Sequence, residues 1–319
     1  MRQLKDRVDI VSVSGGKDST ATLLLAKERP PENMVAVFCD TGHEHKITYE
    51  YIEYLSKTVF PIRTIKVDLS KALKTRVENL GEGGSTRKQW EENGVSGESV
   101  ERVYEFLKNY KLSDNAFLDL AVIKGRFPSK MAKFCTEALK IKAFQNQIVI
   151  PSLEGYDMVV SWVGERAEES KTRAMKSELE EVEDKNLYGS YIYRPILKWT
   201  WREVFDMHSK HNVKPNPLYK MGMKRVGCMP CIFASKQELS EIFKRFPEVV
   251  GNIKMMEKEV NKAQRGRAVR FFSDDKTPNT VSTVEAVEEW AKTSRGGVQK
   301  TLKSTRPAKT CESMYGLCE

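Results

Sequence analysis

The chain contains 319 residues, of which 40% are hydrophobic and 30% charged, a composition that excludes fibrous and broadly disordered proteins. The length is that of about two domains. The net charge of +9 is unevenly spread, because residues 1–200 hold 31 Lys and Arg against 30 Asp and Glu, whereas residues 201–319 hold 22 against 14. No apolar stretch of about 18 residues and no signal-peptide pattern occur, so we expect a soluble, cytoplasmic protein without a membrane partner.

The first elements alternate strand and helix. Residues 8–13 are β-branched and alternate, a glycine-rich string follows, and helical apolar spacing resumes over residues 20–28. A continuous apolar run at 34–39 and a helical pattern at 47–59 repeat the unit, and residues 62–69 predict a third strand. Strands that alternate with helices predict an α/β fold with a doubly wound, mainly parallel sheet.

Residues 70–110 are rich in charges and glycines, which is typical of a mobile loop or lid inserted into the domain. The pattern then predicts a helix near 137–147, a strand at 157–163, a charged helix from 168 to about 184, a strand at 191–196 and a helix at 201–211. After residue 215 the alternation stops. We therefore predict an α/β domain over 1–215 and a smaller, mainly helical, basic region over 216–319, with a turn at 277–280 and a flexible tail at 294–309.

A polar, glycine-rich string joins the first predicted strand to the first helix. It consists of Ser14, Gly15, Gly16, Lys17, Asp18, Ser19 and Thr20. At such a junction backbone N–H groups and the helix dipole point at an anion, the glycines let the backbone approach it, and hydroxyls and Lys17 add donors and charge. The spacing is not that of a Walker A motif. The string predicts a phosphate site, and an ordinary capped turn is the alternative.

The string resembles the SGGxDS PP-loop of the adenine-nucleotide α-hydrolase-like enzymes, which bind ATP and act at its α-phosphate. Further blocks narrow the resemblance to the phosphoadenylyl-sulfate (PAPS) reductase family and its ATP sulfurylase relatives. These blocks are the DTG element at 40–42, the stretch from Gly164 to Ala174, and residues 194–201 with the NPLY sequence at 216–219. They occur in family order. The resemblance implies a Rossmann-like fold of the α-hydrolase-like type.

Each block follows the carboxyl end of a predicted strand, where ligands bind in such sheets. The resemblance implies that the nucleotide is bound by residues 14–20 together with Asp40, Thr41, Gly164, Arg166, Ser170 and Arg173, and that Lys17, Asp18 and Asp40 act in catalysis. Asp18 and Asp40 are the expected Mg²⁺ ligands, because a hard cation prefers carboxylate and phosphate oxygens. Arg166, Lys171 and Arg173 supply cationic donors for phosphate or sulfate, unless they form a solvated helix face.

Six cysteines are too few for a secreted disulfide scaffold of this length. Cys228 and Cys231 lie in a GCMPC turn, close enough in sequence for both sulfurs to bind one metal. Cys135 stands at a predicted helix start, where the thiolate is favoured. Cys39 lies in an apolar strand and is expected in the core.

The GCMPC turn resembles the second half of the cysteine pattern with which adenylyl-sulfate reductases bind a [4Fe–4S] cluster. In the first half Phe134 stands where the family has the first of two tandem cysteines. We expect metal ligation by Cys135, Cys228, Cys231 and Cys318, with Cys311 as the alternative fourth ligand. A zinc site and redox-active thiols are the alternatives to a cluster at these cysteines. Cys311 is also the expected nucleophile, by resemblance to the C-terminal ECG-type tail of the reductases, although the ECGLH string itself is absent.

Three functions follow from these features. The first is an ATP-using enzyme that adenylates an acceptor, releases pyrophosphate and supports sulfur transfer, like the sulfur-transfer proteins of DNA phosphorothioation and the cluster-bearing tRNA thiolases, with a sulfur donor such as a cysteine desulfurase. The intact SGGKDS loop favours it, and the basic C-terminal third suits a nucleic-acid acceptor, or serves only as a solubilising surface. The second is a PAPS or adenylyl-sulfate reductase that makes sulfite with thioredoxin. The third is a non-catalytic nucleotide- or nucleic-acid-binding protein.

Overall fold

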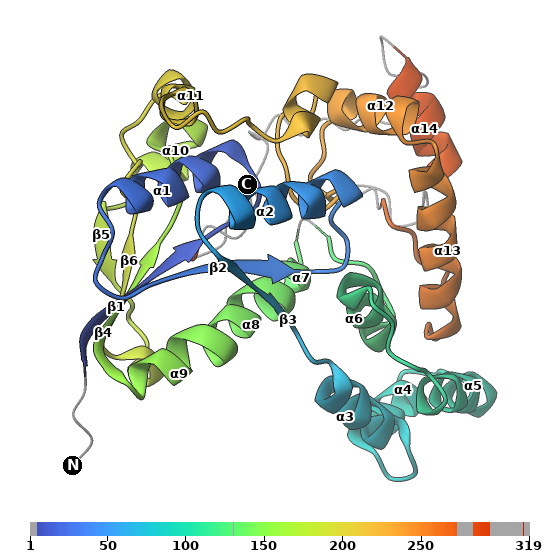
Figure 1. Cartoon of the computed structure of the whole chain (residues 1–319). Coiled ribbons are helices and arrows are strands. Elements are labelled where there is room, and N and C mark those ends of the chain that lie inside the picture. Colours follow the sequence, from blue (N-terminus) through green and yellow to red (C-terminus); the bar gives the residue numbers. More distant parts are fainter. Residues whose placement is uncertain (1–4, 130, 273–282, 294–314, 316–319) are drawn as a thin grey trace. The chain divides into compact units, whose positions relative to one another are not determined.

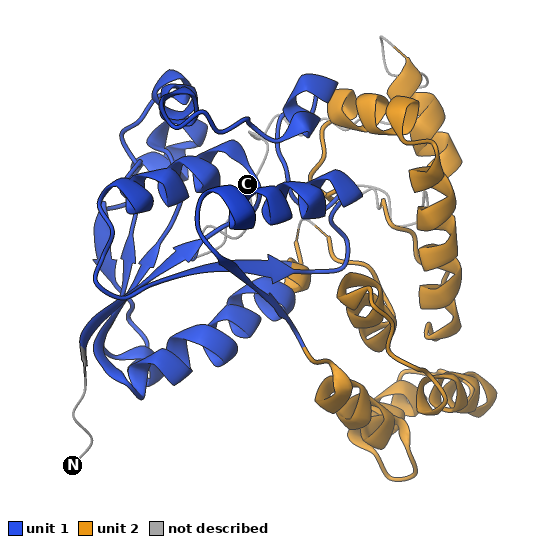
Figure 2. Ribbon diagram, in the orientation of Figure 1, with its two compact units in different colours: residues 1–67, 136–229, 310–319 blue, residues 68–135, 230–309 orange. Residues whose placement is uncertain are grey.

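The computed structural model describes residues 5–129, 131–272, 283–293 and 315. The chain divides into two compact units, each built from separate stretches of sequence (Figure 2). Unit 1 comprises residues 1–67, 136–229 and 310–319, and unit 2 comprises residues 68–135 and 230–309. The boundary predicted after residue 215 falls inside unit 1, and the predicted insertion at 70–110 belongs to unit 2.

Unit 1 is built on a six-stranded sheet with the order β3-β2-β1-β4-β6-β5. The strands are β1 (Lys5–Ser12), β2 (Met34–Asp40), β3 (Ile62–Lys66), β4 (Tyr156–Trp162), β5 (Leu179–Glu181) and β6 (Ser190–Tyr193). All neighbouring strands are parallel except β5 and β6. The predicted α/β class and the doubly wound, mainly parallel sheet are confirmed.

Alternating side chains of the central strands fill two separate cores. Val11 and Val13 lie in a core shared with α1 (Lys17–Glu28), α2 (Lys46–Thr58) and α11 (Trp201–Lys210). Val8 and Ile10 lie in the other core, against the helical stretch that includes α8 (Lys142–Phe144) and α9 (Ile150–Leu153). Figure 1 shows these two sets of helices on opposite faces of the sheet. Both faces are buried, which explains the continuous apolar runs of the strands.

The helix predicted near residues 137–147 is present, but it begins with α7 (Phe134–Thr136) and contains π-helical turns at 137–141 and 145–149. The charged helix predicted from 168 to about 184 is wrong. Instead a 3₁₀ turn at 167–169 and the single turn α10 (Lys171–Ala174) lead into β5, which pairs with β6. Ion pairs of this stretch with buried residues outweigh its helical propensity.

Unit 2 is helical in its described part. Its helices are α3 (Ser70–Leu80), α4 (Ser85–Glu92), α5 (Gly97–Lys108), α6 (Ala116–Lys124), α12 (Lys236–Arg245), α13 (Glu248–Lys262) and α14 (Val284–Lys292). The mobile loop predicted over 70–110 is therefore wrong, because α3 buries Leu80, α4 buries Trp90, and α5 buries three apolar side chains that include Val103. The helical C-terminal region is confirmed, whereas the predicted turn at 277–280 and tail at 294–309 lie outside the described residues. None of the described helices combines the length and apolar composition that a membrane span requires.

Candidate functional site

The glycine string forms the turn between β1 and α1, at the carboxyl edge of the sheet. Gly15 has a φ of +81°, and a Cβ at this position would lie 3.1 Å from Thr48 Cγ2. The hydroxyl oxygens of Ser14 and Ser19 lie 2.9 Å apart, and Thr20 Oγ1 donates to the carbonyl of Gly16 at 2.8 Å. The string is thus a compact turn, and the positive end of the α1 dipole faces it.

The NPLY sequence and α11 hold this turn in place. Asn216 Nδ2 donates to the carbonyl of Gly15 at 3.1 Å, and the backbone N–H of Lys17 donates to the Tyr219 hydroxyl at 2.9 Å. His208 Nε2 donates to the carbonyl of Lys17 at 2.9 Å. Burial lowers the pKa of His208, so this buried imidazole is neutral and acts as a hydrogen-bond donor rather than as a cation. Sequence reasoning missed these three positioning roles.

Asp18 brings the glycine string and the 164–174 block together. Its carboxylate is fully buried, forms an ion pair with Lys17 Nζ, and accepts from Arg166 Nε at 2.5 Å. A Cβ on Gly164 would lie 2.7 Å from the backbone nitrogen of Ser19, so the β4 loop lies directly against the start of α1. Burial opposes the charge of Arg166, but Asp18 outweighs it, and the pKa of Arg166 is raised. Two cations are therefore fixed beside the expected phosphate position.

A second buried carboxylate, Glu165, organises the rest of this block and was not anticipated. Its side chain is fully buried, with Lys176 Nζ at 2.8 Å, Arg194 Nε at 2.9 Å and Arg173 Nε at 3.8 Å. Arg173 also pairs with Glu169. A glutamate directly after a buried strand, with several arginines downstream, is the sequence signal for such a network, because buried charges need partners.

Other residues of the block have clear structural contacts. The Ser170 hydroxyl accepts from the backbone N–H of Arg173 at 3.1 Å and so caps α10. Lys171 is exposed. Arg173 is buried with the Glu165 network rather than presented at the surface. Of the cations predicted for this block, Arg166 is the one that the structure joins to the glycine string.

The DTG element ends β2 in a second polar loop. Asp40 Oδ1 accepts from the backbone N–H of Gly42 and from the Tyr49 hydroxyl, both at 2.7 Å. Thr41 Oγ1 donates to Glu44 at 2.8 Å, and the Tyr49 hydroxyl also lies 3.3 Å from Glu44 Oε2. Burial, followed by the charges of Glu44 and Asp40, raises the pKa of Tyr49. Tyr49 therefore stays protonated and links the two carboxylates.

The first cysteine of the GCMPC turn lies against the DTG loop. Cys228 forms an antiparallel bridge with Glu44, and the Met229 N–H donates to the carbonyl of His43 at 2.9 Å. Cys228 Sγ lies 3.6 Å from Thr41 Oγ1 and donates to Glu44 Oε1 at 3.7 Å. This thiol therefore belongs to the same side-chain cluster as the DTG element.

The predicted metal sites fit the described residues only in part. Within the described ranges, no group of three or more His, Cys, Asp and Glu side chains is arranged to hold a metal ion. Cys228 Sγ lies beside the Glu44 carboxylate, 3.7 Å from Oε1. Cys135 and Cys231 belong to unit 2, and Cys311 and Cys318 lie outside the described residues. The described residues do not complete a cluster site, and Cys39 is buried in the core as expected.

Magnesium fits one of the two predicted carboxylates. Asp18 is buried and is already paired with Lys17 and Arg166. Asp40 is partly exposed, and its Oδ2 lies 3.9 Å from Lys66 Nζ. A hard cation that arrives with phosphates finds a carboxylate oxygen at Asp40.

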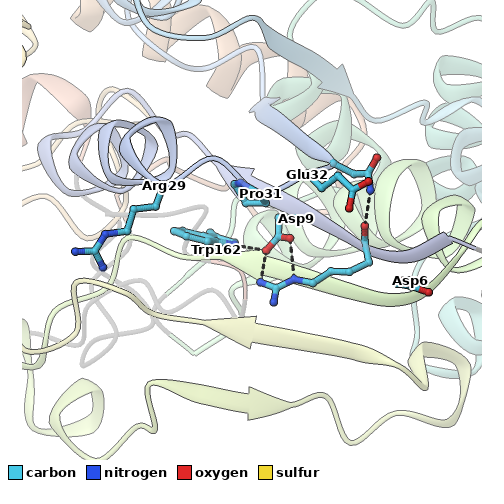
Figure 3. A pocket seen from close by; sticks show the side chains of 8 residues that line it. Asp6, Asp9, Arg29, Pro31, Glu32 and Trp162 are labelled. Carbon is cyan, nitrogen blue, oxygen red and sulfur yellow. Dashed lines mark hydrogen bonds and ion pairs between the residues drawn. The ribbon is translucent and has the colours of Figure 1, made fainter.

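A separate pocket of about 600 Å³ in unit 1 lies beside the first half of β1 and the start of β2 (Figure 3). Its walls include Asp6, Arg7, Asp9, Arg29, Pro31, Glu32, Asn33 and Trp162. Asp9 accepts from Arg7 at 2.8 and 2.5 Å and from Trp162 Nε1 at 2.6 Å, as Figure 3 shows. The buried charge is thus satisfied internally, and the carboxyl edge of the sheet is the stronger candidate site.

Comparison with known proteins agrees with the motif blocks. The family model described as phosphoadenosine phosphosulfate reductase domain matches residues 9–234. An uncharacterized 37.8 kDa protein of Escherichia phage 186 is 42% identical over 98% of this chain and 97% of its own length. The adenosine 5'-phosphosulfate reductase of a Geobacillus species is 24% identical over 72% of this chain and 74% of its own. The crystal structure of a phosphoadenylyl-sulfate reductase from Candida auris, in complex with phosphate, covers 69% of this chain and 80% of its own at 16% identity, with a TM-score of 0.38.

We predict that Gly164→Ala destabilises unit 1 by about 1–3 kcal/mol, because the new Cβ meets the backbone of Asp18 and Ser19. Urea unfolding followed by circular dichroism measures the effect. Gly251→Ala in α13 is the control, since a Cβ there meets nothing within 4 Å. Equal stability of the two variants would contradict the close approach of the β4 loop to α1.

We predict that Glu165→Gln lowers the free energy of unfolding by about 3–5 kcal/mol, because it removes the buried charge that Arg173 and Arg194 share and leaves each guanidinium with one carboxylate partner nearer the surface. The control Glu53→Gln breaks an exposed pair with Lys57 and should cost less than about 1 kcal/mol. Chemical denaturation of both variants checks this. A cost for Glu165→Gln as small as that of the control rules out the network as a stabilising element.

Proposed function

Because this chain belongs to the phosphoadenosine phosphosulfate reductase family, we propose that unit 1 binds ATP at residues 14–20 and cleaves it between the α- and β-phosphates. The observation that carries the proposal is the pair of cations, Lys17 and Arg166, held by buried Asp18 beside the glycine turn at the start of α1. A helix N-terminus with adjacent cations favours an anion with several negative charges.

The two cations have different parts in the proposed binding. Arg166 is buried and held by both Asp18 and Glu168, so its guanidinium is a fixed positive charge. Lys17 has a flexible stem, and its ammonium can exchange the Asp18 oxygen for a phosphate oxygen without moving the backbone. Asp18 is thus a positioning residue that keeps the cations in place until the nucleotide binds.

In the proposed reaction an acceptor oxygen attacks the α-phosphorus, the bond to the bridging oxygen breaks, and pyrophosphate leaves with the electron pair. Lys17 and the start of α1 stabilise the negative charge that develops on the leaving pyrophosphate. Asp40 would hold Mg²⁺, which when bound reduces the charge of the phosphates. The terminal sulfur of a donor persulfide then attacks the adenylated acceptor and displaces AMP, and a thiol reductant cleaves the resulting disulfide to release the thiolated acceptor.

The acceptor class is part of the same proposal. Residues 201–319 hold 22 Lys and Arg against 14 Asp and Glu. This positive charge favours a nucleic-acid acceptor, because contacts with phosphates dominate the affinity of proteins for nucleic acids. A cysteine desulfurase is the proposed class of sulfur donor. The protein need not carry the sulfur on a cluster for this scheme to hold.

The alternative function is reduction of PAPS or adenylyl sulfate to sulfite with thioredoxin. The observation in its favour is the position of Cys228 at the DTG loop, together with the Geobacillus relative, which is named adenosine 5'-phosphosulfate reductase. Cys311 is the proposed nucleophile of that reaction. A non-catalytic nucleotide- or nucleic-acid-binding role is the third candidate.

We predict that purified protein releases pyrophosphate from ATP in the presence of acceptor nucleic acid, and that Lys17→Ala lowers the rate by about 100-fold or more, because the leaving group loses its cation. Lys27→Ala removes an exposed lysine from the same helix and should leave the rate unchanged. Sulfite release from a sulfonucleotide with thioredoxin would replace this proposal with the reductase. Nucleotide binding without release of pyrophosphate or sulfite would favour the non-catalytic role.

We propose the [4Fe–4S] cluster as a separate component, with Cys135, Cys228, Cys231 and a tail cysteine as ligands. We predict that anaerobically purified protein contains iron and acid-labile sulfide and that Cys228→Ser loses both, because a serine oxygen is a poor ligand for this soft metal site. Cys39→Ala is the control, since Cys39 lies in the core. Colourless protein with stoichiometric zinc would establish the zinc alternative instead.

A further inference from the structure

Unit 2 contains a positively charged pocket that none of the motif blocks includes. It has a volume of about 360 Å³ and is lined by Arg76, Trp90, Lys124, Gly125, Arg126, Ala263, Gln264, Arg265 and Val269. The lining comes from α3, α4, the end of α6 and the segment that follows α13. Four of these residues are cationic and none is acidic, so the pocket is complementary to an anion.

Two of the arginines lie against Trp90 at the base of the pocket. The guanidinium carbons of Arg76 and Arg265 are 5.1 and 5.5 Å from the ring centroid of Trp90, which is 7% exposed. The ring holds two like charges near each other. Burial, with a further contribution from Arg265, lowers the pKa of Arg76. An anion between the two guanidiniums would relieve this repulsion.

Arg76 also has an unused donor. Its Nη1 donates to Thr86 Oγ1 at 3.4 Å, whereas its buried Nε has no hydrogen-bond partner among the described residues. Leaving a buried N–H unsatisfied is costly, and native structures contain few such groups. A ligand oxygen is the kind of acceptor that this donor suits.

The four cations are not explained by neighbouring carboxylates. Within the described residues, none of the four forms an ion pair, and three glutamates of the adjoining helices have other partners: Glu257 pairs with Arg270, Glu259 with Lys262 and Glu101 with Arg87. The carboxyl ends of α6 and α13 contribute together about one negative charge. Four positive charges exceed this amount, and the pocket keeps a net positive charge.

The walls of the pocket are fixed before any ligand binds. Gly125 has a φ of +62°, and its backbone lies so close to Ala263 that a Cβ would be 2.8 Å from the Ala263 carbonyl. Arg102 donates to the carbonyls of Lys262 and Gln264 at 3.0 and 2.7 Å. Asn261 exchanges two hydrogen bonds with the backbone of Val269, at 2.9 and 2.8 Å. A preformed site loses little conformational entropy on binding.

We propose that this pocket binds the backbone phosphates of a nucleic acid. Planar guanidiniums match the oxygens of a phosphate, and Arg76 and Arg265 both line the pocket beside Trp90. The lining residues Lys124 and Arg126 are exposed, and exposed Arg267 follows two residues after Arg265, so the surface suits consecutive phosphates rather than one isolated ion. The inference rests on the proposed function for the role of this nucleic acid as the acceptor, whereas the binding itself requires no chemistry in unit 1.

The test is fluorescence anisotropy of a labelled single strand of about 20 nucleotides, in DNA and RNA form, titrated with the full chain at several salt concentrations. We predict that Arg265→Ala weakens binding by about tenfold, because a charge-assisted contact is lost. The slope of log affinity against log salt concentration should fall by about 1. Lys258→Ala removes an exposed lysine of α13 that does not line the pocket, and should change the affinity by less than about twofold.

Two outcomes would overturn the proposal. One is an equal affinity and salt slope for Arg265→Ala and Lys258→Ala, with both variants folded by circular dichroism. The other is that inorganic phosphate quenches the Trp90 fluorescence, taken as the difference between the wild type and Trp90→Phe, while the oligonucleotides neither bind nor quench. Pyrophosphate release is measured separately, so a failure of catalysis with intact oligonucleotide binding contradicts the proposed function and not this site.

Discussion

The buried carboxylate of Asp18 is the interaction on which the candidate site depends. It joins Lys17, at the start of the helix that follows β1, to Arg166 in the loop after β4. The strands β1 and β4 are adjacent in the sheet but distant in sequence. A buried charge is costly unless it is fully paired, so the loop after β4 must stay close to the start of α1. Gly164 permits this approach, because any side chain there would collide with the helix backbone. The pair of cations is therefore a consequence of sheet topology and one carboxylate.

Glu165 is a second buried carboxylate that must be paired, and it ties the loop after β4 to the end of β6. Its partners Arg173, Lys176 and Arg194 come from the turn after β4 and from the end of β6, so residues 164–166 connect the glycine turn on one side to β6 on the other. These ion pairs explain why the charged stretch after residue 168 forms short turns and an edge strand instead of the helix that its composition favours. Tertiary charge pairing decides the local conformation here, and local propensity does not.

The sequence predicted the features that depend on local pattern. The central strands were identifiable because they are buried on both faces, as Val8 and Val11 show for β1, and the polar loops were identifiable because they end those strands. The edge strand β5, whose residues are all exposed, was mistaken for part of a helix. Contacts between distant segments were not identifiable: Tyr219 on the Lys17 N–H, Cys228 beside Glu44, and Trp90 with Arg265. The helices of residues 70–108 were mistaken for a loop, because each buries only one to three side chains and carries charges on the remaining surface.

The cations of the two candidate sites differ in whether they have carboxylate partners, and this difference affects which ligands each site selects. Near the glycine turn each cation has a carboxylate partner, so an incoming anion must compete with Asp18 for Lys17. A nucleotide with several phosphate charges competes better than a singly charged anion, since Coulomb attraction grows with the charge of the ligand. In the unit 2 pocket, Arg76 and Arg265 have no such competitor among the described carboxylates, and binding there follows total charge and salt concentration. Paired cations thus favour discrimination between nucleotides, and unpaired cations favour retention of a polyanion.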